Sequence, residues 1–199
     1  MNKKEPISLA TQKVLFVIFF MFLILFSKYT PYDNATSNDG STMQMIFNLY
    51  FFISNQTFGI VHEGGHGVCY LFNCPQFITT LNGTVFQLLF PLGIGYYYKR
   101  QLNIIGWYIG LFFTGFTLHY TAWYISTAHQ GLHISASQSF LGQEGYHDFN
   151  YMLDAMGLLA YDNGISIAVK LIAYGVMIYA VWRMFFLAFL QTRSNRHSS

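Results

Sequence analysis

Long apolar stretches separated by short polar segments make up most of this chain. A helix that crosses a bilayer needs about 20 mostly apolar residues, and the candidates here are residues 14–26, 43–72, 83–98, 102–127 and 165–191. The polar segments 33–41 and 128–145 are typical of loops, and residues 147–159 form an amphipathic stretch. The pattern predicts an all-α fold: a polytopic integral membrane helical bundle with about four to six membrane segments.

One of the apolar stretches contains helix-breaking residues. Residues 83–98 carry Pro91, Gly93 and Gly95, and such residues are tolerated at membrane depth where the backbone is buried in protein or lines a cavity. This segment is therefore a candidate re-entrant segment beside the active site, rather than a straight span.

Basic residues provide a second argument for the re-entrant segment. The positive-inside rule places basic residues on the cytosolic side, which favours cytosolic chain ends because these carry Lys3, Lys4, Lys13, Arg193 and Arg196. Lys99 and Arg100 reach the same side only if residues 83–98 return to the side on which they start.

Composition supports the membrane assignment. Of the 199 residues, 53% are hydrophobic, 20% aromatic and 9% charged, whereas soluble domains carry about 25% charged residues. We expect a single integral membrane domain over residues 1–199, with a metal-binding core at about 43–160. The basic residues lie at the edges of apolar segments, which indicates topology and excludes a nucleic-acid-binding patch.

The first apolar stretch and the two cysteines each allow an alternative. A cleavable signal peptide is the alternative for residues 14–26, but residues 27–31 offer no cleavage site of the small-x-small type. Cys69 and Cys74 are expected to be small buried hydrophobic residues, with a disulfide or a metal role as the alternative.

The sequence His62-Glu63-Gly64-Gly65-His66 lies within the apolar stretch 43–72. Histidines four residues apart share one face of a helix and can bind the same metal ion, and the glutamate between them can act as general base. A carboxylate in an apolar stretch is unfavourable unless it is paired, protonated or beside a cation. A zinc ion held by His62 and His66 supplies that cation. The alternative is a protonated Glu63 within the bundle, with histidines that pack or relay protons.

Zinc at a catalytic site takes a third protein ligand, and the candidates lie downstream. His147 and Asp148 begin the amphipathic stretch, and Asp154 lies two turns further along. Without a metal, Asp148 would serve as a helix N-cap and His147 as an interfacial histidine. His119 is expected in the core, in a polar cluster with Tyr108 and Tyr120.

These motifs resemble a known family. Residues 58–72 are similar to the active-site helix of the site-2 protease family of intramembrane zinc metalloproteases. The chain more closely resembles small bacterial membrane proteins related to that family, which carry a Gly-Thr-x-x-Gln-Leu-Leu-x-Pro stretch and a later His-Asp-aromatic motif. Residues 83–91 and 147–149 match these two motifs. The resemblance covers roughly residues 58–159.

The resemblance implies a role for each matching residue. His62 and His66 would be zinc ligands and Glu63 the base, with Asp148 as the third ligand and His147 as the next candidate. Gln87 would line the cavity and orient the substrate. The family's third ligand usually stands in a Leu-Asp-Gly setting, whereas the Leu153-Asp154 pair is followed by Ala155, so Asp154 ranks third.

The leading hypothesis is a membrane-embedded zinc metallopeptidase. A zinc-bound water activated by Glu63 would attack a peptide bond in or near a membrane segment. Its partners would be the lipid bilayer and a membrane protein or peptide substrate, and the resemblance implies the bacterial inner (cytoplasmic) membrane. The chain has no PDZ-like domain to select substrates. A non-catalytic metal-binding or structural subunit of a membrane complex is therefore the alternative, and a haem protein using His66 and His119 is a third reading.

Overall fold

Helices make up most of the structure, a computed structural model that describes residues 7–29, 41–134 and 145–190. The long helices are α1 (Leu9–Tyr29), α2 (Thr42–Leu71), α3 (Gln76–Arg100), α4 (Ile104–Ser126) and α6 (Asp162–Phe185). The short elements are α5 (Asp148–Ala155), the 3-10 turns η1 (Ala128–Gln130) and η2 (Leu159–Tyr161), the π-helical turn η3 (Phe186–Leu190), and the antiparallel pair β1 (His133–Ile134) and β2 (Gly145–Tyr146). The predicted helical fold is confirmed for this part of the chain.

Three helical segments are long and apolar enough to cross a membrane: Leu9–Tyr29, Gln76–Arg100 and Leu159–Leu190. They indicate a membrane protein. Helices α2 and α4 coincide with two other predicted stretches but are not among these three segments. The expected total of four to six membrane segments therefore stays a prediction.

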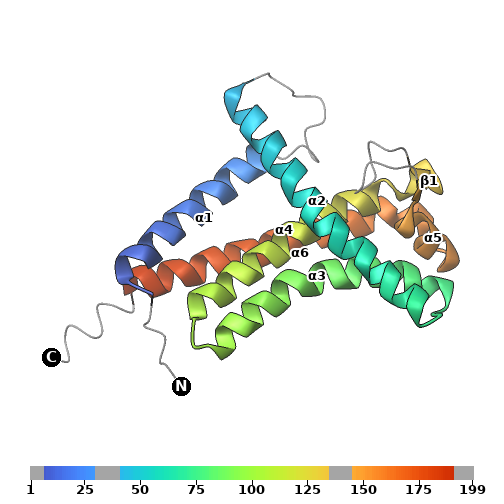
Figure 1. The fold of residues 1–199 in the computed structure, drawn as a ribbon. Helices are drawn as coiled ribbons and strands as arrows, with labels where there is room; N and C mark the ends of the chain where they lie inside the picture. Colours follow the sequence, from blue (N-terminus) through green and yellow to red (C-terminus); the bar gives the residue numbers. More distant parts are fainter. Residues whose placement is uncertain (1–6, 30–40, 135–144, 191–199) are drawn as a thin grey trace.

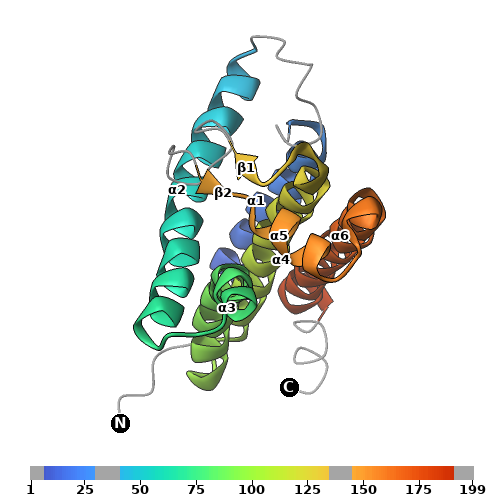
Figure 2. The ribbon, with the colours of Figure 1, turned by 90° about the vertical axis from the view of Figure 1, so that its right-hand side faces the viewer.

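The helices run between two ends of the molecule (Figures 1 and 2). The start of α1, the α3–α4 turn and the end of α6 lie at one end, which we call the basic end because it carries Lys13, Lys99, Arg100 and Arg183. The α2–α3 turn, the end of α4, α5 and the start of α6 lie at the other end, which we call the α5 end.

The segment 83–98 is not re-entrant in the structure. It belongs to α3, a continuous helix of 25 residues that contains Pro91. Lys99 and Arg100 nevertheless lie at the same end as Lys13, because α1 and α2 meet at an angle and together pass along the molecule once (Figure 1). The re-entrant prediction was wrong because it assumed that the stretches 14–26 and 43–72 each cross the membrane separately.

The glycines of α3 and α4 permit close helix packing rather than a break. A Cβ atom built on Gly110 would lie 2.5 Å from the Cα of Gly95 and 2.8 Å from the carbonyl oxygen of Pro91. Small residues at a helix interface let two backbones approach each other in this way. Two of the three breakers that suggested a re-entrant segment, Pro91 and Gly95, therefore lie at the α3–α4 interface, whereas Gly93 is exposed.

Aromatic side chains join α1 and α2 to the rest of the bundle. The core includes Phe19 and Phe26 of α1, Phe47 and Phe51 of α2, Phe112 and Phe116 of α4, and Met177 and Met184 of α6. His119 is fully buried, as expected, and its ring packs edge-on against Phe26 and Tyr174. Tyr108 accepts a hydrogen bond from Arg183.

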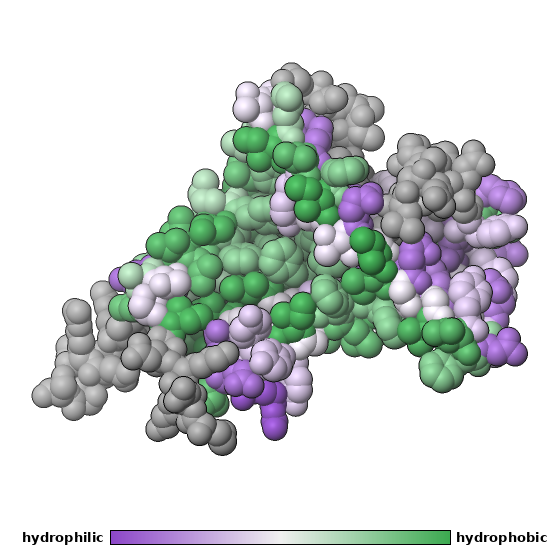
Figure 3. Space-filling view, viewed as in Figure 1, coloured by the Kyte–Doolittle hydropathy of each residue, from purple (hydrophilic) through white to green (hydrophobic). Residues whose placement is uncertain are grey.

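Apolar surface extends over the helices between the two ends (Figure 3). In this view hydrophilic residues gather at the α3–α4 turn and around α5, while exposed apolar residues lie between them. Examples with more than half of the residue exposed are Val14, Ile18, Leu49, Phe52 and Ile60. Large exposed apolar surface of this kind marks contact with lipid or with another protein.

The Gly95–Gly110 contact predicts a sharp difference between two glycine variants. Gly110→Ala should destabilise the protein by about 1–3 kcal/mol, because the new methyl group overlaps backbone atoms of α3. Thermal unfolding in detergent measures this effect. Gly93→Ala is the matched control, since nothing lies within 4 Å of its Cβ position. Equal melting temperatures for the two variants would contradict the assigned helix contact.

Candidate metal centre

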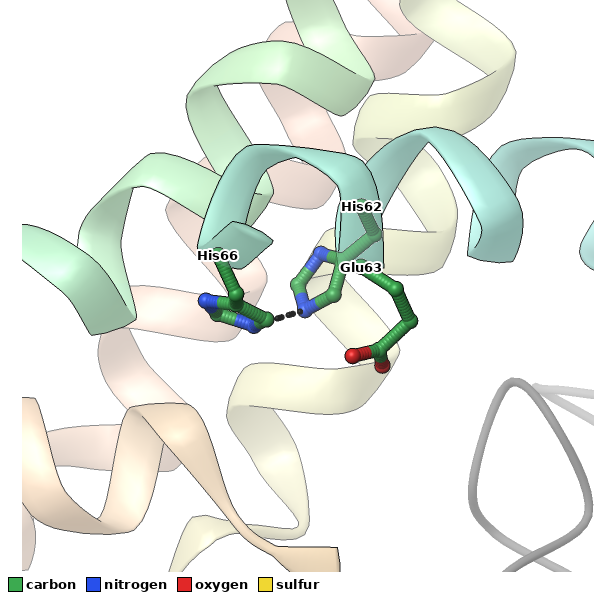
Figure 4. Close-up of side chains that lie close together, drawn as sticks. All are labelled: His62, Glu63 and His66. Atoms are coloured by element: carbon green, nitrogen blue, oxygen red, sulfur yellow. Dashed lines mark hydrogen bonds between the residues drawn. The ribbon is translucent and has the colours of Figure 1, made fainter. Parts of the chain in front are cut away.

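His62 and His66 lie on the same face of α2, in its last turns (Figure 4). Their Nε2 atoms are 3.1 Å apart. The His62 side chain is 2% exposed and that of His66 is 13% exposed. The predicted pairing of the two imidazoles is therefore present in the fold.

Asp148, the first residue of α5, brings a carboxylate to the two histidines. Its Oδ2 atom lies 2.8 Å from the Nε2 of His62 and 3.4 Å from the Nε2 of His66. Zinc–ligand bonds of 2.0–2.1 Å in a tetrahedron place neighbouring ligand atoms about 3.3 Å apart. The three side chains thus fit the spacing of a zinc site, although Asp148 is 86 residues from His62 in the sequence.

Hydrogen bonds on the far side of each ring determine how the imidazoles face Asp148. The Nδ1 of His66 donates to the carbonyl oxygen of Thr79, 2.8 Å away. The Nδ1 of His62 lies 3.2 Å from Oε1 of Gln87, whose amide nitrogen donates to Thr117 at 2.6 Å. Metal-binding histidines are commonly oriented through their other nitrogen in this way. In the neutral rings, both Nε2 lone pairs then point towards the Asp148 carboxylate.

Three electron-rich atoms therefore converge on one point. Either a shared proton or a metal cation can satisfy them, and two imidazoles with one carboxylate form a donor set that zinc favours. Burial alone would raise the pKa of the Asp148 carboxyl, but hydrogen bonding to the two imidazoles through the shared proton holds it below its usual value. Asp148 is thus a carboxylate at neutral pH, the form that binds metal.

His147 lies next to this centre but is oriented away from it. Its ring stacks on Tyr124, with ring centroids 4.2 Å apart. Its Nδ1 accepts the Asn150 backbone N–H as the N-cap of α5, and its Nε2 is 3.0 Å from the Thr127 hydroxyl. Burial lowers the pKa of His147 to about 4, so the ring is neutral at pH 7.

The interactions of His147 position Asp148. The ring anchors the first turn of α5 against the end of α4, and the Asp148 backbone N–H donates to the Tyr124 hydroxyl at 3.2 Å. The N-cap of α5 is therefore His147 and not Asp148, the residue expected in that position. This leaves the Asp148 carboxylate directed at the histidine pair.

Glu63 lies beside the pair without contacting it. Its carboxylate and the two histidines have possible ligand atoms that all lie within 4.8 Å of one another. The Glu63 side chain is exposed, unlike those of His62 and Asp148. Figure 4 shows its carboxylate on the same side of α2 as the two rings. The Glu63 carboxylate is therefore close enough to act at a metal ion that the two histidines hold.

Two glycines allow α3 to approach α2 at the site. A Cβ atom on Gly65 would lie 2.5 Å from the Asn82 carbonyl oxygen, and one on Gly83 would lie 2.6 Å from Cε1 of His66 and 2.9 Å from Cε1 of His62. Nothing lies within 4 Å of the Cβ positions of Gly64 and Gly67. Close packing therefore explains Gly65, and Gly83 provides the space that the imidazoles occupy.

The other residues singled out in the sequence lie elsewhere. Asp154 is exposed on α5, and His129 pairs with Asp162 at 2.6 Å. Gln87 lies behind His62 and orients it, a different position from the predicted contact with substrate. No sequence pattern points to the Thr79 carbonyl, because every residue has a backbone carbonyl. The sequence analysis also did not predict that Gly83 leaves space for the imidazoles, although Gly83 is the first residue of the Gly-Thr-x-x-Gln motif.

The position of Gly83 makes a test possible away from the ligands themselves. Gly83→Ala should weaken zinc binding about 10- to 100-fold, a loss typical of disturbed ligand orientation, because its methyl group displaces both imidazoles. Competition with a zinc-binding dye in detergent measures the affinity. Gly67→Ala should bind zinc like the wild type. Unchanged affinity in Gly83→Ala would show that the imidazoles do not bind zinc in this arrangement.

Comparisons with known proteins returned no match to this chain: no family model, no curated protein and no solved structure is significantly similar. The argument for a function therefore comes from the geometry of the site.

Proposed function

We propose that this protein is a membrane-embedded zinc metallopeptidase. The observation that carries the proposal is the convergence of His62, His66 and Asp148 at mutual distances of 2.8–3.4 Å, with Glu63 beside them. Three protein ligands with a further position open are typical of catalytic zinc, whereas structural zinc takes four protein ligands.

Each residue has a defined part in peptide hydrolysis. His62, His66 and Asp148 would hold zinc, which when bound polarises a carbonyl group and makes a water molecule more acidic. Glu63 would accept a proton from the attacking water and pass it to the leaving amine. Its exposed, unligated carboxylate suits a group that must exchange protons. Gln87 and the Thr79 carbonyl would keep the two imidazoles in place.

The apolar surface around the site supports a substrate from the membrane. Exposed apolar residues such as Leu49, Phe52 and Ile60 lie on α2, the helix that carries both histidines. An extended apolar segment of a membrane protein or peptide is the class of substrate that such a surface accommodates. The apolar cavity of about 520 Å³ is a separate feature, because its lining runs from Phe58 and Pro91 towards Tyr98 and Asn103 at the α3–α4 turn and includes none of the candidate ligands.

Metal content tests the ligand set. Purified wild-type protein should contain about one zinc per chain, and Asp148→Asn should lose most of it because the third ligand is weakened. Asp154→Asn is the control, since this exposed carboxylate on the same helix should leave the zinc content unchanged. Mass spectrometry of the metal gives the ratio. A folded wild type without zinc in metal-replete buffer would refute the proposal.

Hydrolysis tests the role of Glu63. Glu63→Gln should keep its zinc and lose activity by about 10²- to 10⁴-fold, the usual contribution of a general base. The assay uses an apolar, fluorescently quenched peptide library in detergent micelles, with wild type and Asp148→Asn beside the variant. Zinc binding without cleavage in the wild type would favour the alternative, a metal-binding subunit of a membrane complex.

A further inference from the structure

The turn between α2 and α3 brings the two cysteines of the chain together. The backbone N–H of Cys74 donates to the carbonyl oxygen of Cys69 at 3.0 Å, and that of Asn73 donates to Tyr70 at 3.3 Å. Asn73 has a positive φ of 54°. This pair of bonds around a left-handed residue defines a Schellman motif, in which the side chains at the positions of Cys69 and Cys74 contact each other.

The same motif ends two other helices, so the residues at the two contacting positions can be compared. At the end of α5 the corresponding residues are Leu153 and Leu158, and at the end of α3 they are Tyr98 and Asn103. At the end of α2 the two positions hold the thiols of Cys69 and Cys74. Contacting residues at these positions fall within the reach of a disulfide bond.

We propose that Cys69 and Cys74 form a reversible disulfide that closes the end of the metal-binding helix. Both cysteines are free thiols in the structure, Cys69 buried and Cys74 partly exposed. Cys74 is therefore the thiol that an external oxidant reaches first, and Cys69 is the resolving thiol.

The oxidant is a small disulfide such as oxidised glutathione. The Cys74 thiolate attacks one sulfur of the oxidant, forms a mixed disulfide and releases one thiolate. The Cys69 thiol loses its proton, and its thiolate attacks the Cys74 sulfur and releases the second thiolate. The two cysteines together lose two electrons and two protons, and the oxidant is reduced to two thiols.

The position of the turn suits this reaction. It lies at the α5 end, whereas Lys13, Lys99 and Arg100 lie at the basic end. If the basic end faces the cytosol, as the positive-inside rule requires, the α2–α3 turn faces the opposite compartment. Disulfides form and persist in the oxidising compartments outside the cytosol.

The turn is also joined to the candidate metal centre. The Thr79 hydroxyl lies within hydrogen-bonding distance of the carbonyl oxygens of Cys74 and Pro75, at 3.4 and 3.2 Å, and the Thr79 carbonyl accepts from His66. A disulfide would fix the turn and with it the carbonyl that orients His66. The effect of the disulfide on His66 rests on the proposed zinc site. We expect the oxidised protein to release zinc more slowly than the reduced protein.

Thiol labelling of the full-length protein in detergent tests the disulfide itself. The chain has two cysteines, so reduced and denatured wild type should take up two maleimide labels, and protein pretreated with oxidised glutathione should take up none and remain a monomer. Cys69→Ser should instead retain glutathione on Cys74. Glutathione adducts on wild type, dimers linked by disulfides, or two labels after oxidation would each overturn the proposal.

Zinc release to a chelator tests the connection to the metal centre. Oxidised wild type should lose zinc several-fold more slowly than reduced wild type, and the Cys69→Ser/Cys74→Ser double variant should show no difference between the two treatments. Equal rates for oxidised and reduced wild type would overturn the connection while leaving the disulfide established. Absence of zinc from both forms would refute the zinc site, and the labelling result would stand independently.

Discussion

The hydrogen bonds behind the two imidazoles are the interactions on which the candidate site depends. The Thr79 carbonyl oxygen and the Gln87 amide oxygen accept from Nδ1 of His66 and His62. Both acceptors belong to α3, so the orientation of the α2 ligands is determined by the neighbouring helix. Each Nε2 lone pair then points at the Asp148 carboxylate, and the electrostatics of the centre follow from this arrangement.

Close packing of α2 on α3 is the condition for those hydrogen bonds. Gly65 and Gly83 have no side chains, and the Asn82 amide donates to the Gly65 carbonyl oxygen at 2.7 Å across the contact. The turn that joins the helices carries the two cysteines and leads directly into Thr79. Packing, turn geometry and ligand orientation therefore form one connected unit, in which a change at the turn can reach His66.

The remaining ligand comes from the opposite side of the site. Asp148 stands at the start of a short helix that His147 caps and that Tyr124 and Thr127 of the α4 end hold in place. Glu63 is separate from this framework. Its exposed carboxylate has a possible ligand atom within 4.8 Å of those of the two histidines, where the proposed hydrolysis would use it as the base.

The helical fold, the histidine pair and the range of third-ligand candidates could be predicted from the sequence, because hydrophobic periodicity and four-residue spacing are local properties. The difference between His147 and Asp148 could not, since it depends on tertiary contacts: Asp148 faces the histidine pair, and His147 stacks on Tyr124. Tertiary contacts also decided the path of α3. Pro91 and Gly95 look like breakers in sequence, but both pack against Gly110 of the partner helix α4. The contact partners of a residue are nonlocal, and the sequence pattern does not contain them.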